Sequence, residues 1–245
     1  MTDTRPPSRP LLVVDALSVS YGEAKAVSGV SFTLAPGRAV AVLGANGSGK
    51  SSLAAALVGV VRPSGGRVSF DGVDITRRPA HRVSRAGIAY VPEGRGIYPH
   101  LTVADNLRAM LRYAVPRGDR QDALERAVEL FPVLGQRRKQ AAGTLSGGEQ
   151  QMLSLARVLA APPKLLVADE MSLGLAPKMV DVVFDSLTRA KDAGVTVVLV
   201  EQYVERALAL ADDAIVLRQG VIAWSGAAAD AHTQVVASYL GGEPL

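Results

Sequence analysis

One segment of the chain, Gly44 to Ser52 (GANGSGKSS), has residue types and spacing suited to binding phosphate groups. It fits the Walker A pattern G-x-x-x-x-G-K-[ST], in which backbone N–H groups of a glycine-rich loop surround the phosphates of a nucleotide. The apolar run 40–43 precedes the segment and a helix-compatible stretch, 52–58, follows it, so the strand–loop–helix context of the pattern is present. The residues predicted to contact the nucleotide are Gly44, Asn46, Gly47, Ser48, Gly49, Lys50, Ser51 and Ser52.

Two side chains of this segment predict specific chemistry. The Lys50 ammonium would reach the β and γ phosphates, and the Ser51 hydroxyl would bind Mg2+. The predicted ligands are therefore a nucleotide and Mg2+. The alternative is a glycine-rich turn without a ligand, but the flanking strand and helix patterns make a chance match a poor explanation.

The apolar run 165–168 ends in two acids, Asp169 and Glu170, as expected of a parallel strand that is buried on both faces. Ligands bind at the carboxyl ends of such strands, so Asp169 is placed to hold Mg2+ through a water molecule. Glu170 is placed to polarise a water molecule for in-line attack on a γ-phosphate. Acids after a strand usually belong to a solvated loop or a helix cap. The Walker segment, together with a second glycine-containing segment further along the chain, favours the catalytic interpretation.

The second of these segments is LSGGEQQ, at 145–151, which combines a turn with the start of an amphipathic helix. Ser146 and Glu149 have the spacing of an N-terminal capping box, which predicts that the helix begins at Ser146. Gly147 and Gly148 add no side chains there, so backbone N–H groups and the helix dipole can face an anion. One nucleotide-binding chain seldom needs two phosphate-binding segments, which predicts that this one serves a partner. The alternative is a well-capped surface helix.

The three motifs, in this order, resemble those of the nucleotide-binding subunits of ABC transporters, over about residues 11–240. The resemblance implies that ATP is the nucleotide and that two subunits enclose two ATP molecules. Each ATP would lie between the Walker segment of one subunit and the signature segment of the other, Ser146, Gly147, Gly148 and Glu149. The resemblance also implies that Tyr21, in LSVSYG, stacks on adenine, although Tyr21 alone is more typical of core or strand packing.

The fold that the resemblance implies is α/β: a P-loop NTPase ABC cassette with a RecA-like core, an antiparallel β subdomain and an inserted helical subdomain. The region 102–161 shows only helical periodicity, whereas apolar runs predict strands at 11–14, 31–34, 40–43, 68–70, 88–91, 165–168, 195–200 and 214–217. Asp71-Gly72 and Gln219-Gly220 predict turns between short strands. The expected parts are a flexible tail at 1–10, an ATP-binding core at 11–91 and 162–245, and a helical subdomain at 92–161.

Three features depart from the general pattern of the superfamily. One is the loop after Glu170, which has Leu175 where an aspartate commonly helps to couple the two sites and Met171 where a proline is frequent. Glu93, in YVPEGR, replaces a glutamine that contacts Mg2+ and water, and a carboxylate can still bind a hard cation. Gln202 stands where most relatives have a histidine that contacts the γ-phosphate. VPEGRGIYPHLTVADNL, VLVEQ and SLGLAP together resemble the LivF-type ATPase subunits of branched-chain amino-acid importers, whose relatives share both replacements. Related urea-importer subunits tend to keep glutamine at the position of Glu93. The alternative is that Glu93 and Gln202 are ordinary loop residues.

Composition narrows the classes of protein that remain. The 245 residues are 48% hydrophobic, which is enough for one large α/β domain or two small ones. No run of about 18 apolar residues is present, so attachment to a membrane would come from partners. The absence of cysteine rules out a disulfide scaffold. The net charge of +4 is spread along the chain and the few aromatic residues do not interleave with basic ones, so we predict no nucleic-acid partner.

The expected function is ATP binding and hydrolysis that drive uptake of branched-chain amino acids, by a peripheral subunit at the cytoplasmic face of the plasma membrane. The resemblance implies a second ATP-binding subunit, in a heterodimer or a homodimer, two transmembrane permease subunits and, indirectly, a solute-binding protein. The expected catalytic residues are Glu170, Lys50 and Gln202, and the expected Mg2+ ligands are Ser51, Glu93 and Asp169. Alternatives are a transporter of urea, amides or other amino acids, a soluble ABC ATPase acting on DNA or ribosomes, and a module that binds ATP without hydrolysing it.

Overall fold

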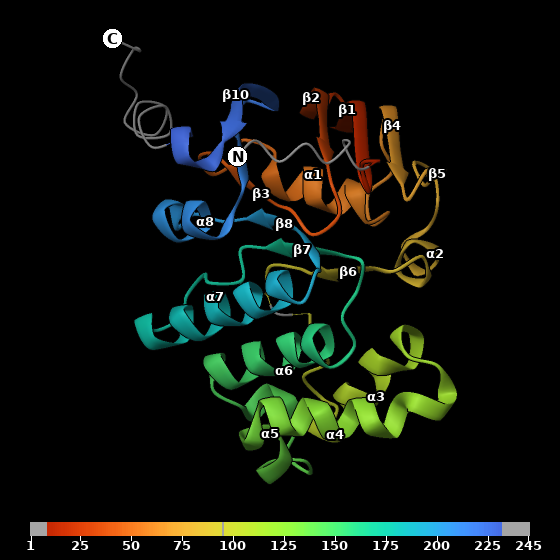
Figure 1. Cartoon of the computed structure of the whole chain (residues 1–245), viewed down its shortest axis with the longest axis vertical. Coiled ribbons are helices and arrows are strands. Elements are labelled where there is room, and N and C mark those ends of the chain that lie inside the picture. The colour runs from red at the N-terminus through yellow and green to blue at the C-terminus, as the bar shows by residue number, and fades with distance from the viewer. Residues whose placement is uncertain (1–8, 95, 232–245) are drawn as a thin grey trace, which may run out of the picture.

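The computed structural model describes residues 9–94 and 96–231, which form two β-sheets with helices packed around them (Figure 1). Three predicted features fall partly outside the described residues. They are the tail at 1–10, of which only Arg9 and Pro10 are described, the end of the predicted core at 232–245, and Arg95 in the YVPEGR segment.

The smaller sheet is antiparallel and has the strand order β2-β1-β4-β5. Its strands are β1 (Leu12–Tyr21), β2 (Ala24–Leu34), β4 (Gly65–Phe70) and β5 (Val73–Asp74). β1 continues beyond the predicted 11–14. Just after the predicted end, Ala16 adopts a left-handed φ of 47° and the pairing register shifts. This bulge interrupts the alternation of inward and outward side chains, which resumes with Leu17 and Val19 buried. β2 likewise begins seven residues before the predicted 31–34, where exposed positions weaken its apolar pattern.

The larger sheet has the order β10-β9-β3-β8-β7-β6, and its strands run parallel except that β10 pairs antiparallel with β9 at one edge. Each predicted strand overlaps a strand of one of the two sheets, and in the larger sheet the predicted ends differ from the observed ends by at most one residue. Its strands are β3 (Ala39–Leu43), β6 (Ile88–Val91), β7 (Leu165–Asp169), β8 (Thr196–Val200), β9 (Asp213–Arg218) and β10 (Val221–Ala227).

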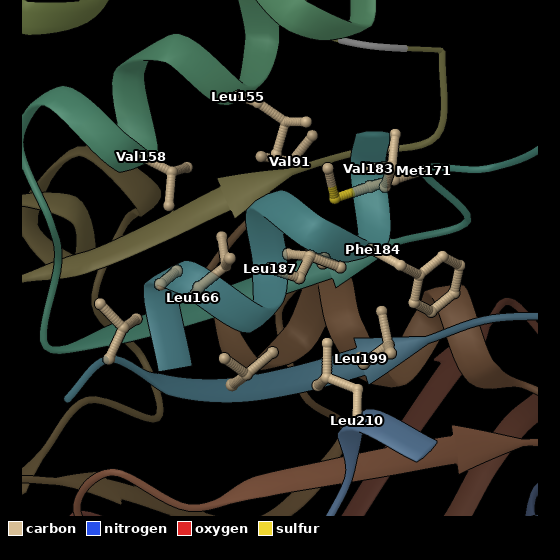
Figure 2. Close-up of a cluster of buried hydrophobic side chains, with 14 of the residues drawn as sticks. Val91, Leu155, Val158, Leu166, Met171, Val183, Phe184, Leu187, Leu199 and Leu210 are labelled. Carbon is tan, nitrogen blue, oxygen red and sulfur yellow. The ribbon is translucent and has the colours of Figure 1, made fainter. Parts of the chain in front are cut away.

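The central strands of the larger sheet are buried on both faces. Every residue of β3, β7 and β8 is buried, which confirms the prediction of a doubly covered strand at 165–168. Successive side chains enter different cores: Leu166 and Leu199 join one hydrophobic cluster, whereas Val167 and Val198 join the other. Figure 2 shows part of the first cluster, with residues of the helix at 177–192 packed over the strands that carry Leu166 and Leu199.

The two predicted tight turns are present. Asp71 and Gly72 have φ values of 50° and 76° between β4 and β5, and Gln219 and Gly220 have φ values of 49° and 80° between β9 and β10. Two consecutive left-handed residues are the signature of a type I′ turn, which suits the twist of a two-residue hairpin.

The helices divide into those that cover the larger sheet and those that form a separate layer. In chain order, the helices of both groups are α1 (Lys50–Leu57), α2 (Ala80–Arg85), α3 (Val103–Ala114), α4 (Arg120–Leu130), α5 (Pro132–Gln136), α6 (Gly147–Ala160), α7 (Pro177–Asp192) and α8 (Val204–Leu210). The region 102–161 forms α3 to α6 without a strand, as predicted, and lies away from the smaller sheet (Figure 1). α6 contacts α7 on one side and α3 and α4 on the other, so it joins the two layers. Among the helices described, none is both long and apolar enough to cross a membrane.

Candidate nucleotide site

The glycine-rich loop joins the end of β3 to α1, and two of its glycines are required by close backbone contacts. Gly49 has a φ of 103°, and a Cβ there would lie 2.2 Å from the carbonyl oxygen of Ala26. Gly44 has a φ of 153°, and its Cβ would lie 2.4 Å from the carbonyl oxygen of Leu217. Because β2 and β9 press on the loop at these two points, larger residues would displace it. The strand–loop–helix context predicted from the sequence is confirmed.

The start of α1 lacks the groups that normally cap a helix. Gly49 is the N-cap residue, no side chain accepts a hydrogen bond there, and the first turn contains no acid. By contrast, α3 is capped by Thr102 and α6 by Ser146. An uncapped N-terminus leaves N–H groups and the positive end of the helix dipole for an anion, as phosphate-binding loops require.

Lys50 holds its ammonium at the mouth of this loop. Its side chain is only 3% exposed, and Nζ donates hydrogen bonds to the carbonyl oxygens of Gly44, at 2.9 Å, and Ala45, at 3.1 Å. Nζ also lies 3.7 Å from Glu170 Oε1. Ser48 is a further polar group in the loop: its Oγ is buried and has no hydrogen-bond partner within the described structure. A buried hydroxyl without a partner is costly, which fits a loop that completes its hydrogen bonds with a ligand.

Asp169 is held from two sides at the end of β7. The Ser51 hydroxyl donates to Oδ1 and the Tyr90 hydroxyl donates to Oδ2, each at 3.1 Å. Burial raises the pKa of the Asp169 carboxyl, and the two hydrogen bonds oppose that rise. Burial, followed by the nearby Asp169 charge, also raises the pKa of Tyr90, so its phenol stays protonated and donates. The sequence pointed to Ser51 and Asp169 but not to Tyr90.

Glu170 is the first residue after β7 and has an unusual backbone conformation. Its φ is 46°, in the left-handed region that non-glycine residues seldom adopt, and its N–H donates to the Val200 carbonyl at 2.8 Å. Gln202, which follows the neighbouring strand β8, donates from Nε2 to Glu170 Oε2 at 2.9 Å. Glu170 therefore lies between the Lys50 ammonium and the Gln202 amide, and the strained turn directs its carboxylate to that place.

A cavity of about 380 Å³ brings Lys50, Ser51, Glu170 and Gln202 together, whereas the predicted site residues Gly44, Ser48 and Asp169 are not among the residues that line it. Glu93, distant in sequence, lies on the same cavity because β6 and β7 are neighbouring parallel strands, whose carboxyl ends meet at one edge of the sheet. The sequence did not point to two lining residues, Ala26 and Leu173. The lining is formed by Ala26, Asn46, Gly47, Gly49, Lys50, Ser51, Ser52, Glu93, Glu170, Leu173 and Gln202.

Tyr21 is at the end of β1 and is not among the residues that line this cavity. It is 52% exposed, which does not support the interpretation of Tyr21 as a core residue. It pairs with Ala24 across the β1–β2 hairpin, two residues from Ala26, which does line the cavity. An exposed aromatic residue on this hairpin is accessible to a base from solvent, which agrees with the predicted stacking.

The signature segment forms the N-terminus of α6, as predicted. Ser146 is the N-cap residue, and both hydrogen bonds of the capping box are present: Ser146 Oγ accepts from the Glu149 N–H, and Glu149 Oε2 accepts from the Ser146 N–H. Glu149 also pairs with Arg137 at 3.0 Å, and the backbone hydrogen bond from Ser146 is the main cause that lowers its pKa. The Glu149 carboxylate is thus used within its own chain, and its predicted contact to a nucleotide stays a prediction.

The signature segment and the Walker segment do not share a cavity in this chain. None of Ser146, Gly147, Gly148 and Glu149 lines the cavity formed by the Walker segment. Gly148 instead faces α7, where an added Cβ would lie 2.7 Å from Met179 Cγ. A single chain therefore presents two separate candidate phosphate-binding segments, as expected if the second one serves another subunit.

Comparison with known proteins gives consistent matches. A model of the ABC transporter family matches residues 27–172, which include the Walker segment, the signature segment and Glu170. The high-affinity branched-chain amino acid transport ATP-binding protein BraG of Pseudomonas aeruginosa is 42% identical over 95% of this chain and 100% of its own length. The probable branched-chain amino acid transport ATP-binding protein LivF of Archaeoglobus fulgidus is 37% identical over 86% of this chain and 90% of its own length.

A solved structure also has the same fold. The ADP conformation of an ATP-binding cassette of an ABC transporter superposes with a TM-score of 0.79 and 25% identity, covering 96% of this chain and 100% of the other. The predicted α/β cassette, with an antiparallel sheet beside a mainly parallel one, is confirmed.

Proposed function

The chain belongs to the ABC transporter family, as an ATP-binding subunit that hydrolyses ATP, and we propose that it energises the uptake of branched-chain amino acids. The observation that carries the choice of substrate is the 42% identity to BraG over the whole length of that relative. Glu93 and Gln202 support it as well: they are two of the departures from the general superfamily pattern, the resemblance to LivF-type subunits includes both, and they line one cavity with the Walker segment. A urea or amide transporter is the second candidate, but urea-importer relatives tend to keep glutamine at the position of Glu93, which favours the amino-acid group.

The proposed chemical step is in-line attack of water on the γ-phosphate. A P–O bond to the water oxygen forms, the bond from the γ-phosphorus to the oxygen that bridges to the β-phosphate breaks, ADP leaves, and Glu170 accepts the proton of the water. Glu170 accepts a hydrogen bond from the attacking water, and the Gln202 amide, at 2.9 Å, fixes the direction of its carboxylate. Lys50 offers positive charge to the β and γ phosphates, where negative charge develops in the transition state. Tyr21 is proposed to stack on adenine, and the N–H groups of the glycine-rich loop to surround the phosphates.

The proposed Mg2+ ligands are Ser51, Asp169 and Glu93, with Asp169 acting through water. A hydroxyl and two carboxylates are the hard oxygen ligands that this cation takes. The Ser51 hydroxyl lies 3.1 Å from Asp169 Oδ1, and Ser51 shares the cavity with Glu93. When bound, Mg2+ neutralises charge on the β and γ phosphates. Tyr90 keeps the second carboxylate oxygen of Asp169 in place.

Tyr90→Phe is expected to weaken Mg2+ binding roughly tenfold, because hydrogen bonds to metal ligands orient them. The measurement is a titration of Mg2+ at fixed ATP, read as ATP turnover, together with Mn2+ binding in the presence of ATP followed by electron paramagnetic resonance. Tyr98→Phe is the matched control, since the Tyr98 side chain is exposed. Equal metal dependence of the Tyr90→Phe variant and the unmodified protein would show that Tyr90 does not support the metal site.

The proposed assembly contains a second ATP-binding subunit, whose signature segment completes the site on this chain. Ser146, Gly147 and Gly148 of this chain would in turn contact the ATP held by that subunit. The separation of the two segments within one chain supports this arrangement. We further propose two transmembrane permease subunits that hold the assembly at the cytoplasmic face of the plasma membrane, a solute-binding protein that delivers the substrate, and no nucleic-acid partner.

Gln202→His is expected to raise ATP turnover at this chain's own site, by roughly tenfold at most. An imidazole can take part in proton transfer and can carry a positive charge beside the γ-phosphate, whereas an amide cannot. Turnover is measured in the assembled transporter, with Gln121→His on the exposed face of α4 as control. If turnover is unchanged while Glu170→Gln abolishes it, the residue at this position does not limit the rate.

The direct test of the substrate class starts from the native membrane. A tagged chain is used to copurify its complex, and the permease subunits and solute-binding protein are identified by mass spectrometry. The ATP turnover of that complex is then measured with its solute-binding protein and leucine, isoleucine, valine or urea. We expect stimulation by the three amino acids. Stimulation by urea alone would replace the proposed substrate with the second candidate.

A further inference from the structure

Glu201, the first residue after β8, places a carboxylate in the protein interior directly behind the candidate site. Its side chain is 1% exposed, as is that of Ser172, which follows β7. The Ser172 N–H donates to Glu201 Oε1 at 3.2 Å, and the Ser172 hydroxyl donates to Glu201 Oε2. The N–H of Gln202 lies 3.4 Å from Oε2 and also donates to it. A buried carboxylate is costly unless such donors surround it, so this arrangement calls for an explanation.

The hydrogen bonds of Glu201 close a ring through the two loops that carry the reacting groups. β7 and β8 are neighbouring parallel strands, with Asp169 opposite Val200, so the loops that follow them start side by side. One connection between the loops is Ser172 to Glu201. The other is Gln202 Nε2 to Glu170 Oε2 at 2.9 Å. Each loop therefore contributes one residue to each connection. We call the Ser172–Glu201 connection the inner one and the Gln202–Glu170 connection, which lies at the cavity, the outer one.

The inner connection determines where the outer one can form. Glu201 and Gln202 are consecutive, so fixing the Glu201 carboxylate on Ser172 fixes the start of the Gln202 side chain. Ser172 is two residues from Glu170, so the same bonds also limit movement of the loop that carries the proposed base. Glu170, Ser172, Glu201 and Gln202 also line a second cavity of about 280 Å³ next to the first, so the loops have space to move there if they are not connected.

We propose that Glu201 is a positioning residue for ATP hydrolysis: its carboxylate holds Ser172 so that the Gln202 amide stays on the Glu170 carboxylate. The proposal rests on the proposed role of Glu170 as the group that orients the attacking water. Glu201 does not line the cavity of the Walker segment, so it acts through Gln202 and not on the nucleotide. Burial raises the pKa of Glu201 and the Ser172 hydrogen bonds oppose that rise, as expected of a carboxylate kept in place by its donors.

Glu201→Gln in the assembled transporter is the first test. Glutamine has nearly the same size as glutamate, but only one of its two terminal atoms, the amide oxygen, can accept a hydrogen bond. Part of the hydrogen bonding to Ser172 is therefore lost. We expect kcat to fall roughly tenfold or more, because small displacements of reacting groups are costly, while the KM for ATP and ATP binding change less than about twofold. Glu205→Gln, on the exposed side of α8 four residues later, is the matched control and is expected to keep the kcat of the unmodified protein.

A double-mutant cycle separates positioning from general stability. If Glu201 acts through Gln202, then Glu201→Gln lowers kcat in the unmodified background but not in a Gln202→Ala background. Ser172→Ala is the second variant, which removes one donor and is expected to show the same dependence on Gln202. Thermal unfolding of each variant shows that it is folded at the assay temperature.

The proposal is overturned if Glu201→Gln and Ser172→Ala keep the kcat of the unmodified protein, or if their effects add in full to that of Gln202→Ala. Failure of the proposed role of Glu170 gives a different result: the Glu170→Gln variant would still hydrolyse ATP. In that case the premise is wrong. If Glu170→Gln is inactive and the Glu201 variants are fully active, only the positioning role is wrong.

Discussion

Glu170→Gln is expected to lower ATP turnover by roughly 10²- to 10⁴-fold, the range typical for loss of a general base. The carboxylate sits between the Lys50 ammonium and the Gln202 amide, at the carboxyl end of a fully buried strand. An amide at this position has no negative charge with which to polarise water. Nucleotide binding is expected to persist, because the groups proposed to contact the phosphates belong to the Walker segment and are unchanged.

Two measurements check this expectation in the assembled transporter: steady-state phosphate release, and ATP affinity by equilibrium titration. Glu129→Gln, on an exposed position of α4, makes the same chemical change away from the cavity. The account is contradicted if Glu170→Gln retains more than about a tenth of the turnover of the unmodified protein, because the water would then be activated by another group.

Lys50→Ala is expected to weaken ATP binding by roughly 10- to 100-fold and to remove turnover. Hydrogen bonds to charged groups contribute about 1.5–3 kcal/mol, and about 1.4 kcal/mol corresponds to tenfold in affinity. The Lys50 ammonium is buried and already oriented by the Gly44 and Ala45 carbonyls, so little order has to be created when phosphate binds. Lys50→Arg keeps the charge, but the planar guanidinium differs in shape from an ammonium. The ATP affinity of this variant is expected to lie between those of the unmodified protein and of Lys50→Ala.

The affinity of these variants is measured by calorimetric titration with ATP and ADP. Lys164→Ala is the control, since Lys164 is an exposed lysine that pairs with Asp71 on the surface. Equal ATP affinity for Lys50→Ala and Lys164→Ala would contradict the assignment of the Walker segment as the phosphate site. Loss of affinity in Lys50→Ala with normal turnover at saturating ATP would assign Lys50 to binding alone.

Local patterns predicted much of the site because its residues follow strands. The Walker segment and the signature capping box are encoded within a few consecutive residues, so spacing alone placed them on the start of a helix. Glu93 and Gln202 were placed through the resemblance, and the sheet order then explains why they meet: β6 and β8 lie on either side of β7, which leads to Glu170. The two type I′ turns were readable because Asp-Gly and Gln-Gly mark them directly.

Other contacts depend on register and could not be inferred from the sequence. Tyr90 has the appearance of a strand residue, and its hydroxyl reaches Asp169 only because β6 pairs in parallel with β7. Glu201 is adjacent in sequence to Gln202, yet its partner Ser172 lies on another loop. The length of β1 was missed because one bulge residue, Ala16, breaks the alternation on which strand prediction depends. β10 was also missed, since its side chains alternate between exposed and half-buried positions and form no apolar run.

The central claim is that ATP hydrolysed at Glu170 drives the uptake of branched-chain amino acids. The direct measurement is uptake of labelled leucine into proteoliposomes that contain the copurified complex, with the solute-binding protein inside or outside as orientation requires and ATP on the side of this subunit. The account predicts ATP-dependent accumulation of leucine that is lost in the Glu170→Gln complex and kept in the Glu129→Gln complex. Leucine accumulation that continues with Glu170→Gln, or ATP hydrolysis by the complex without any leucine accumulation, would contradict it.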